Sequence, residues 1–285
     1  MALFDLTLNL AALLLWLSWC SRHLEPLARN APATIAGTVK RAEPRSSRGW
    51  LMLSGLVFLL AARALFYHQV GSAVGWTPKL DLGPVVLPFR SDLPGSVVLY
   101  SCLSFGRVCA IYYFWLLAIV LINWAVTEPD PLLRLFRLHL GRMRGWPWPV
   151  LAFLPLVGVT ALWFALHPLL QRAGVVIPSQ EYSQILEQGL LLTLTLVLSL
   201  KYLLPVFLIL EMVAAHVYLG MNPVWSFVTI TSKNILRPLS PLPLRLAKVD
   251  LAPITATILI LVLLHWLPQA IQNELGRRHL VLWPQ

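Results

Sequence analysis

The chain has 285 residues, of which 58% are hydrophobic and 12% charged, and it contains 12 Trp. Soluble globular domains are nearer to about 45–50% apolar and about 25% charged, and a domain of this length could not bury so many apolar side chains in one core. Several apolar runs approach the roughly 20 residues that a bilayer about 30 Å thick requires. The composition predicts a membrane protein and excludes the secreted, collagenous and disordered classes.

Lys and Arg outnumber Asp and Glu by 22 to 12, which gives a net charge of +10. The basic residues are spread between apolar segments, and no aromatic-basic motif of a nucleic-acid reader is present. We therefore attribute the excess to cytoplasmic loops of a membrane protein and expect no nucleic-acid partner. The three cysteines form no CxxC motif, so they predict neither a disulfide framework nor a zinc site.

Taken in chain order, the apolar segments predict an all-α, polytopic protein with about six transmembrane helices. These cover approximately 6–20, 50–70, 96–123, 150–166, 189–219 and 251–267. The first helix can extend to residue 2 if Asp5 lies at the membrane interface. The fourth is expected to stop at Pro168. The fifth is longer than the hydrocarbon layer, so it must tilt or kink, and Pro205 is the expected kink.

Two connecting segments have a clear character. Residues 21–48 are polar and basic, as in a loosely ordered cytoplasmic linker. Residues 71–95 contain four prolines, which exclude a continuous helix and leave either a loop or a re-entrant segment.

The distribution of Lys and Arg predicts the orientation. The loops after the first, third and fifth helices carry 14 of these residues, whereas the other two loops and the C-terminal tail carry 5. This bias places the first set in the cytoplasm and both termini outside, in a protein integral to the cytoplasmic membrane.

Two of the cytoplasmic loops resemble each other, which indicates an internal repeat. In each, an apolar pair precedes an arginine, and a Pro-containing motif opens the next helix about 12–16 residues later. The two arginines, Arg134 and Arg237, are 103 residues apart. The pattern predicts a tandem parallel repeat of two-helix units.

The second copy resembles the YggT family of small integral membrane proteins. The family pattern is matched by Leu236-Arg237-Pro238-Leu239 and then Asp250-Leu251-Ala252-Pro253. The first copy keeps Asp130-Pro131-Leu132-Leu133-Arg134 but has Leu135 in place of the proline. The resemblance covers about residues 96–267 and implies two units, 96–188, a first YggT-like unit, and 189–285, a second such unit with the tail. The first two helices are an addition: 1–49 is expected to be an N-terminal helix and basic cytoplasmic linker, and 50–95 a second helix and Pro-rich outer loop.

Family members are linked to envelope organisation, division, osmotic tolerance and cytochrome b assembly, with no agreed molecular activity. The resemblance therefore implies a non-enzymatic scaffold or assembly factor. Such a protein would contact anionic headgroups and a membrane-protein partner or a second copy. The residues expected to make these contacts or to belong to the motif are Arg134, Arg137, Arg237, Pro238, Asp250 and Pro253.

Two of these motif residues allow a closer interpretation. Arg237 follows an amphipathic segment, 223–235, which could lie at the membrane surface. The arginine could bind lipid phosphate or cap a helix end, or its charge could serve only to keep the loop in the cytoplasm. Asp250 precedes the last helix, and we expect it to be the N-cap, with a salt bridge near Arg237 as the alternative.

Charges inside spans are functional hypotheses because burying them in lipid is unfavourable. We single out Arg107, Lys201 and Glu211. Arg107 and Glu211 occupy nearly equivalent positions of the repeat and are expected to pair. The alternatives are a solute pathway lined by these residues and independent interfacial charges.

No motif of a known catalytic site is present, so we expect no enzyme and no cofactor. Four histidines lie near span ends, namely His68, His167, His216 and His265. Haem or metal binding is conceivable there, although no ligand spacing distinguishes them. A scaffold or assembly factor is the leading hypothesis, and a small transporter or channel is the alternative.

Overall fold

The computed structural model describes residues 2–28, 48–82, 86–126, 131–141, 146–176, 182–217, 222–240, 245–246 and 249–277. Within these ranges the chain is mainly helical, and five helices are long and apolar enough to span a membrane. They are Leu3–Ser21, Gly49–Gly71, Pro94–Ile122, Trp148–Arg172 and Tyr182–Ala215. A further apolar segment, Ala252–Leu267, is shorter. The predicted helical membrane class is confirmed at this level.

The chain divides into two compact units, each of which is described by itself. Unit 1 comprises Met1–Leu80 and Val86–Ala110, and unit 2 comprises Asp81–Val85 and Ile111–Gln285.

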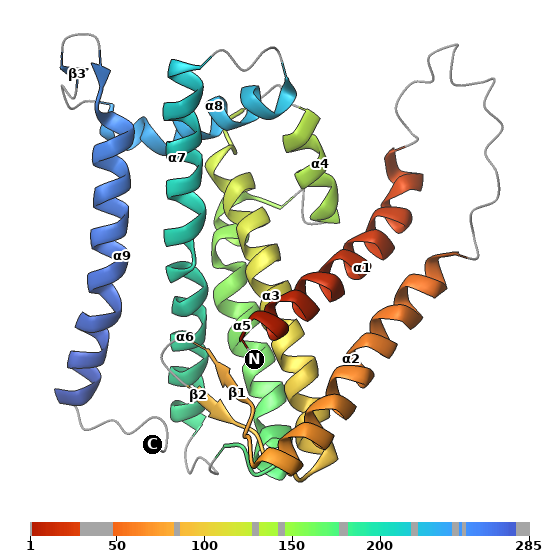
Figure 1. Ribbon diagram of the computed structural model, residues 1–285. Helices are drawn as coiled ribbons and strands as arrows, with labels where there is room; N and C mark the ends of the chain where they lie inside the picture. Colours follow the sequence, from red (N-terminus) through yellow and green to blue (C-terminus); the bar gives the residue numbers. More distant parts are fainter. Residues whose placement is uncertain are drawn as a thin grey trace, which may run out of the picture. The chain divides into compact units, whose positions relative to one another are not determined.

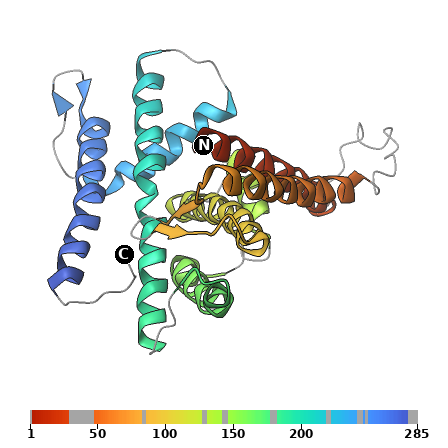
Figure 2. The same ribbon diagram turned by 60° about the horizontal axis from the view of Figure 1, so that its bottom comes forward.

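Unit 1 contains helix α1 (Ala2–Ala28), helix α2 (Arg48–Val74) and the first part of helix α3 (Pro94–Ile122). The first two helices lie side by side in both views (Figures 1 and 2). Small residues permit this approach: Ala12 is fully buried, and a Cβ atom on Gly55 would lie 4.0 Å from Leu15. Close packing of small residues is typical of helix pairs in membranes.

The Pro-rich segment between α2 and α3 forms a short hairpin, where the sequence left a loop or a re-entrant segment open. Strands β1 (Lys79–Asp81) and β2 (Val86–Pro88) pair. Leu80, Leu87 and Phe89 are buried on one side of the hairpin. Pro78 and Pro88 lie at the ends of the short strands, where a missing N–H group is tolerated.

Unit 2 contains the end of α3 and the remaining elements. These are α4 (Pro131–His139), α5 (Trp148–Arg172), α6 (Tyr182–Leu198), α7 (Leu200–His216), α8 (Pro223–Leu236), the 3-10 turn η3 (Arg237–Leu239), β3 (Arg245–Leu246), β4 (Val249–Asp250) and α9 (Ala252–Arg277). Helix α5 packs against α6, and α7 packs against α9. The short helix α8 runs across α7 at a steep angle and also contacts α4 (Figure 1).

The end of the fourth predicted helix differs from expectation. Helix α5 passes through Pro168 and ends at Arg172. Its end is set by Gly174, whose φ of 67° is in the left-handed region. Val175 N donates to Leu170 O, and Gly174 N donates to Gln171 O, which together form a Schellman motif. The proline interrupts one backbone bond, but the glycine ends the helix.

The break in the fifth predicted helix also lies elsewhere. Helices α6 and α7 meet at Ser199, whereas Pro205 lies inside α7. The Ser199 hydroxyl donates to Leu196 O, and it accepts a hydrogen bond of 2.9 Å from the indole of Trp115. A serine that bonds to local backbone offers an alternative to the regular helical bond. The observed break therefore lies six residues before Pro205, and the expected kink at Pro205 itself stays a prediction.

The last helix begins one position later than the predicted cap requires. Thr255 N donates to Leu251 O, the first hydrogen bond of α9, so Leu251 occupies the N-cap. Asp250 lies one residue earlier, in β4. The assignment of Asp250 as N-cap was wrong because strand β4 extends the backbone up to that residue.

Close packing between α5 and α6 allows a prediction from two glycines. A Cβ atom on Gly189 would lie 2.9 Å from Thr160 Cγ2 and 3.0 Å from its Cα, whereas Gly158 has nothing within 4 Å. We expect Gly189→Ala to destabilise the protein by about 1–3 kcal/mol, because a helix must move. Gly158→Ala should be neutral or stabilising by up to about 1 kcal/mol. Thermal unfolding of both variants in detergent measures the difference, and equal effects would contradict the packing.

Candidate functional site

The first three helices each contribute a pair of polar residues one turn apart. Helix α1 carries Asp5 and Asn9, α2 carries Arg63 and Tyr67, and α3 carries Tyr100 and Ser104. Residues four positions apart lie on one face of a helix. We call these six residues, all in unit 1, the Asp5–Arg63 cluster.

Arg63 is the centre of the cluster. Its Nη2 atom lies 2.5 Å from Asp5 Oδ1 and donates to Ser104 Oγ at 3.0 Å. Its Nη1 atom donates to Asn9 Oδ1 at 2.8 Å. The guanidinium carbon lies 5.5 Å from the ring centre of Tyr67 and 5.3 Å from that of Tyr100, within the range of cation–π attraction.

Asp5 accepts hydrogen bonds from the other two helices. The Tyr67 hydroxyl donates to Oδ1, and the Tyr100 hydroxyl donates to Oδ2 at 3.1 Å. Asp5 also lies in the first turn of α1, where the helix dipole favours a negative charge. Both carboxylate oxygens therefore have donors, and the acid neutralises the arginine.

Burial makes this pairing necessary. The side chain of Arg63 is 0% exposed and that of Asp5 is 19% exposed. An unpaired charge at membrane depth would cost several kcal/mol, on the order of 3 for insertion alone. Among the described residues, only the Nε atom of Arg63 is left without a hydrogen-bond acceptor within this cluster. The cluster can hold three helices together electrostatically and by hydrogen bonds.

The hairpin between α2 and α3 covers one end of the cluster. The ring of Phe89 lies 5.5 Å from that of Tyr100, and the ring of Trp76 lies 5.2 Å from that of Tyr67. His68 Nδ1 lies 2.8 Å from Ser91 O, which fixes the chain after the hairpin to α2. Both tyrosines are buried in this packing.

An exposed ion pair in the same unit provides a contrast. Arg90 donates from Nη2 to Asp92 Oδ2 at 2.8 Å and from Nε to Oδ1 at 3.3 Å. These hydrogen bonds lower the pKa of the Asp92 carboxyl and raise the pKa of Arg90. Exposed pairs of this kind add little stability.

Unit 2 contains a second cluster of buried polar side chains, around Asn123 at the end of α3. The Asn123 amide donates to Thr231 Oγ1 at 3.1 Å and accepts from Asn234 Nδ2 at 2.9 Å. The main-chain carbonyl of Asn123 accepts a hydrogen bond from Arg137 Nη2 at 3.1 Å. Asn123 and Thr231 are both fully buried. These bonds join α3, α4 and α8.

The three predicted intramembrane charges lie in α3 and α7. Lys201 Nζ is 5.1 Å from the ring centre of Tyr202. Oε2 of Glu211 is buried without a hydrogen-bond partner among the described residues. Arg107 and Glu211 belong to different units, so their predicted pairing stays a prediction. Arg63, which lies in the span Gly49–Gly71 and was not selected from the sequence, is paired with Asp5.

The motif residues differ in environment. Arg134 is exposed, Arg237 and Pro238 are exposed in η3, and Pro253 is buried near the start of α9. Asp250 lies in β4, and its side chain is outside the described part. Arg137 differs from the other two arginines of the motifs, because it donates hydrogen bonds to two main-chain carbonyls after the end of α3.

The histidines near span ends are dispersed. His167 is buried in α5, and His265 is exposed in α9, where it lies 3.4 Å from Gln269. Across the described ranges, no group of three or more His, Cys, Asp or Glu side chains could hold a metal ion.

The fold and the clusters define a class, that of helical membrane proteins in which buried polar side chains join the helices. Comparison with known proteins adds no family: no protein-family model, no curated protein and no solved structure matches the chain.

Proposed function

We propose that the protein is a non-enzymatic scaffold or assembly factor of the YggT type in the cytoplasmic membrane, with about six spans and both termini outside. The Asp5–Arg63 cluster carries the proposal, because its charges are engaged in holding three helices together. The outer faces of the spans are apolar and accessible, as at Phe58, which is 75% exposed. Such faces suit contact with lipid, a membrane-protein partner or a second copy.

The order of elements supports a tandem repeat as part of this proposal. Helices α3, α4 and α5 follow one another as a long, a short and a long helix, and the α6–α7 span (Tyr182–Ala215), α8 and α9 do the same. The two short helices contact each other. They follow the third and fifth predicted spans, whose loops carry the excess of positive charge that favours the cytoplasmic side.

A small transporter or channel is the second candidate, favoured by one observation. Glu211 has a buried carboxylate oxygen without a partner among the described residues, and an ionisable residue within a span is a functional hypothesis by default. A pathway would then run along α7, past Lys201 and Glu211.

Purification of the full chain in mild detergent, with identification of the proteins and lipids that accompany it, distinguishes the two candidates. We expect a defined membrane-protein partner or a dimer, and no ion flux in liposomes made with the purified chain. Flux that is abolished by Glu211→Gln, together with the recovery of no partner, would overturn the scaffold proposal.

A further inference from the structure

The short helices α4 and α8, with η3, form one module in unit 2. Their apolar faces are buried against each other and against α3 and α7, where the ring of Phe227 lies 5.3 Å from that of Phe136 and 5.7 Å from that of Phe207. Leu133 and Val228 complete this core. The apolar face of 223–235, which the sequence suggested for the membrane surface, therefore packs on protein. The exposed surface of the module therefore consists of its other faces, together with the exposed side chains of Leu135 and Val224.

The module carries only positive charge. No Asp or Glu occurs in residues 131–139 or 223–239. Arg134, Lys233 and Arg237 are exposed, and none of them forms a salt bridge in the described part of the chain. Lys233 and Arg237 are four residues apart, which places them on one face of α8 and its continuation.

Arg137 has a different role, although it belongs to the same loop motif. It is partly buried and donates to Asn123 O at 3.1 Å and to Val126 O at 3.4 Å. These carbonyls follow the end of α3, where a cation also complements the helix dipole, and that of Asn123 accepts from Val126 N as well. Its charge is therefore engaged within the protein.

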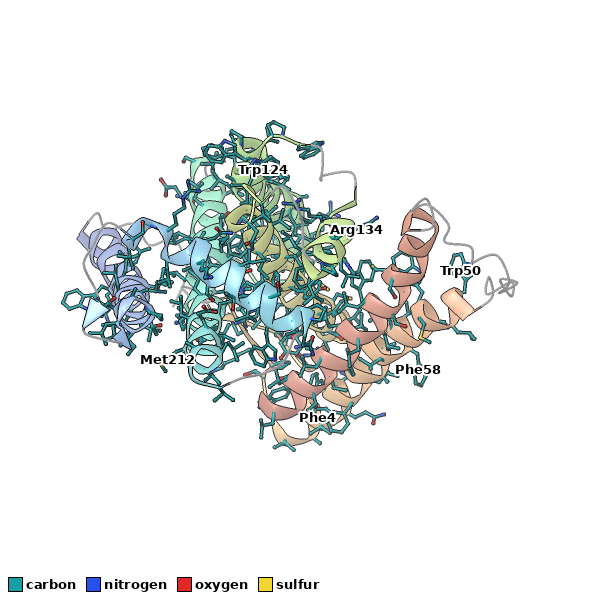
Figure 3. All side chains as sticks on the ribbon, turned by 90° about the horizontal axis from the view of Figure 1, so that it is seen from above. Phe4, Trp50, Phe58, Trp124, Arg134 and Met212 are labelled. Atoms are coloured by element: carbon teal, nitrogen blue, oxygen red, sulfur yellow. The ribbon has the colours of Figure 1, made fainter. Side chains whose placement is uncertain are left out.

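Tryptophans at the same end of the unit indicate the headgroup level. Trp124 follows Asn123 directly, and Trp146 and Trp148 flank the start of α5; all three are exposed. Figure 3 looks onto this end, with Trp124 and Arg134 labelled and α8 crossing in view. Exposed tryptophans concentrate at membrane–water interfaces, which favours a lipid ligand over an acidic segment of a soluble protein.

We propose that Arg134, Lys233 and Arg237 bind the phosphate groups of anionic lipid headgroups, and that Arg137 takes no part in this binding. The proposal deepens the scaffold function and rests on it, since it names the lipid that the α4–α8 module holds. A cation near an anionic surface contributes roughly a five-fold gain in affinity, and arginine can engage phosphate through two parallel hydrogen bonds.

The test uses the full chain reconstituted in vesicles of phosphatidylcholine with 10% phosphatidylglycerol. After extraction in mild detergent, the two lipids retained by the protein are measured by mass spectrometry at low and high salt. We expect several-fold enrichment of phosphatidylglycerol at low salt. Each of Arg134→Gln, Lys233→Gln and Arg237→Gln should lower the affinity for phosphatidylglycerol by up to roughly five-fold and reduce the enrichment, which should disappear in the triple variant.

Arg137→Gln is the matched control from the same loop. It should lower the temperature of unfolding, because the end of α3 loses two hydrogen bonds, yet keep the wild-type enrichment. Unchanged enrichment in the triple variant would overturn the proposal, as would a loss in Arg137→Gln equal to that in Arg134→Gln. Binding of a polyglutamate peptide that depends on the three cations, without lipid enrichment, would assign the surface to an acidic protein instead. Because lipid retention is measured without a protein partner, its failure leaves the scaffold proposal to be judged by co-purification.

Discussion

Arg63→Met is expected to destabilise the protein by about 3–5 kcal/mol, the largest effect of any single substitution proposed for this chain. The substitution leaves Asp5 as a charged, mostly buried side chain facing the hydroxyls of Tyr67 and Tyr100. The hydrogen bonds from Arg63 to Asn9 and Ser104 are lost at the same time. Unfolding of the purified protein by denaturant in micelles measures the change.

A double variant distinguishes the loss of the Asp5–Arg63 ion pair from the loss of side-chain volume. In Asp5→Leu/Arg63→Met both charges are removed, so the double variant should lose less stability than the sum of the single variants, by about 1–3 kcal/mol. Arg90→Met is the control from the same unit, because Arg90 and Asp92 form an exposed pair, and we expect its unfolding curve to match that of the wild type. Additive effects of the two buried substitutions would show that Asp5 and Arg63 do not interact.

The helices were predictable because length and apolar content alone indicate a span, and the five long apolar helices lie close to predicted segments. The ends and breaks were not predictable from proline alone. In α5 the decisive feature is the left-handed backbone at Gly174, and in the fifth span it is the hydroxyl of Ser199 bonded to Trp115. Both features depend on a tertiary contact or a backbone angle, which the positions of the prolines do not reveal.

The candidate site was missed for a different reason. Asp5 was treated as an interfacial residue and Arg63 was not selected, because each helix was considered by itself. The available signal was the four-residue spacing of polar residues in three consecutive spans: Asp5 and Asn9, Arg63 and Tyr67, and Tyr100 and Ser104. That spacing places each pair on one helix face but cannot say which faces meet.

The loop motifs illustrate the limit of charge patterns. Arg134 and Arg137 are three residues apart in one basic loop, and sequence alone gives them the same expected role. The fold leaves the first exposed and uses the second to cap α3. The distinction arises because α4, which was not predicted, turns Arg137 toward the end of α3.

Asn123→Leu is expected to loosen the junction of α3, α4 and α8 by roughly 2–3 kcal/mol, because the buried hydroxyl of Thr231 and the amide of Asn234 each lose a partner. The effect should be local. Hydrogen exchange of the backbone amides of α8 should accelerate roughly 30- to 150-fold, if those amides exchange by opening of this junction. Amides of α1, which belongs to the other unit, should keep their wild-type rates.

Two threonine substitutions test whether the bond across helices causes this effect. Thr231→Val removes the hydroxyl that accepts from Asn123, whereas Thr195→Val removes one that donates to Leu191 O within its own helix. The first should accelerate exchange in α8 by roughly 5- to 30-fold, corresponding to about 1–2 kcal/mol, and the second should leave it unchanged. Equal exchange in the two variants would mean that apolar packing around Phe227 and Leu133 holds α3, α4 and α8 together, and that the hydrogen bonds of Asn123 do not.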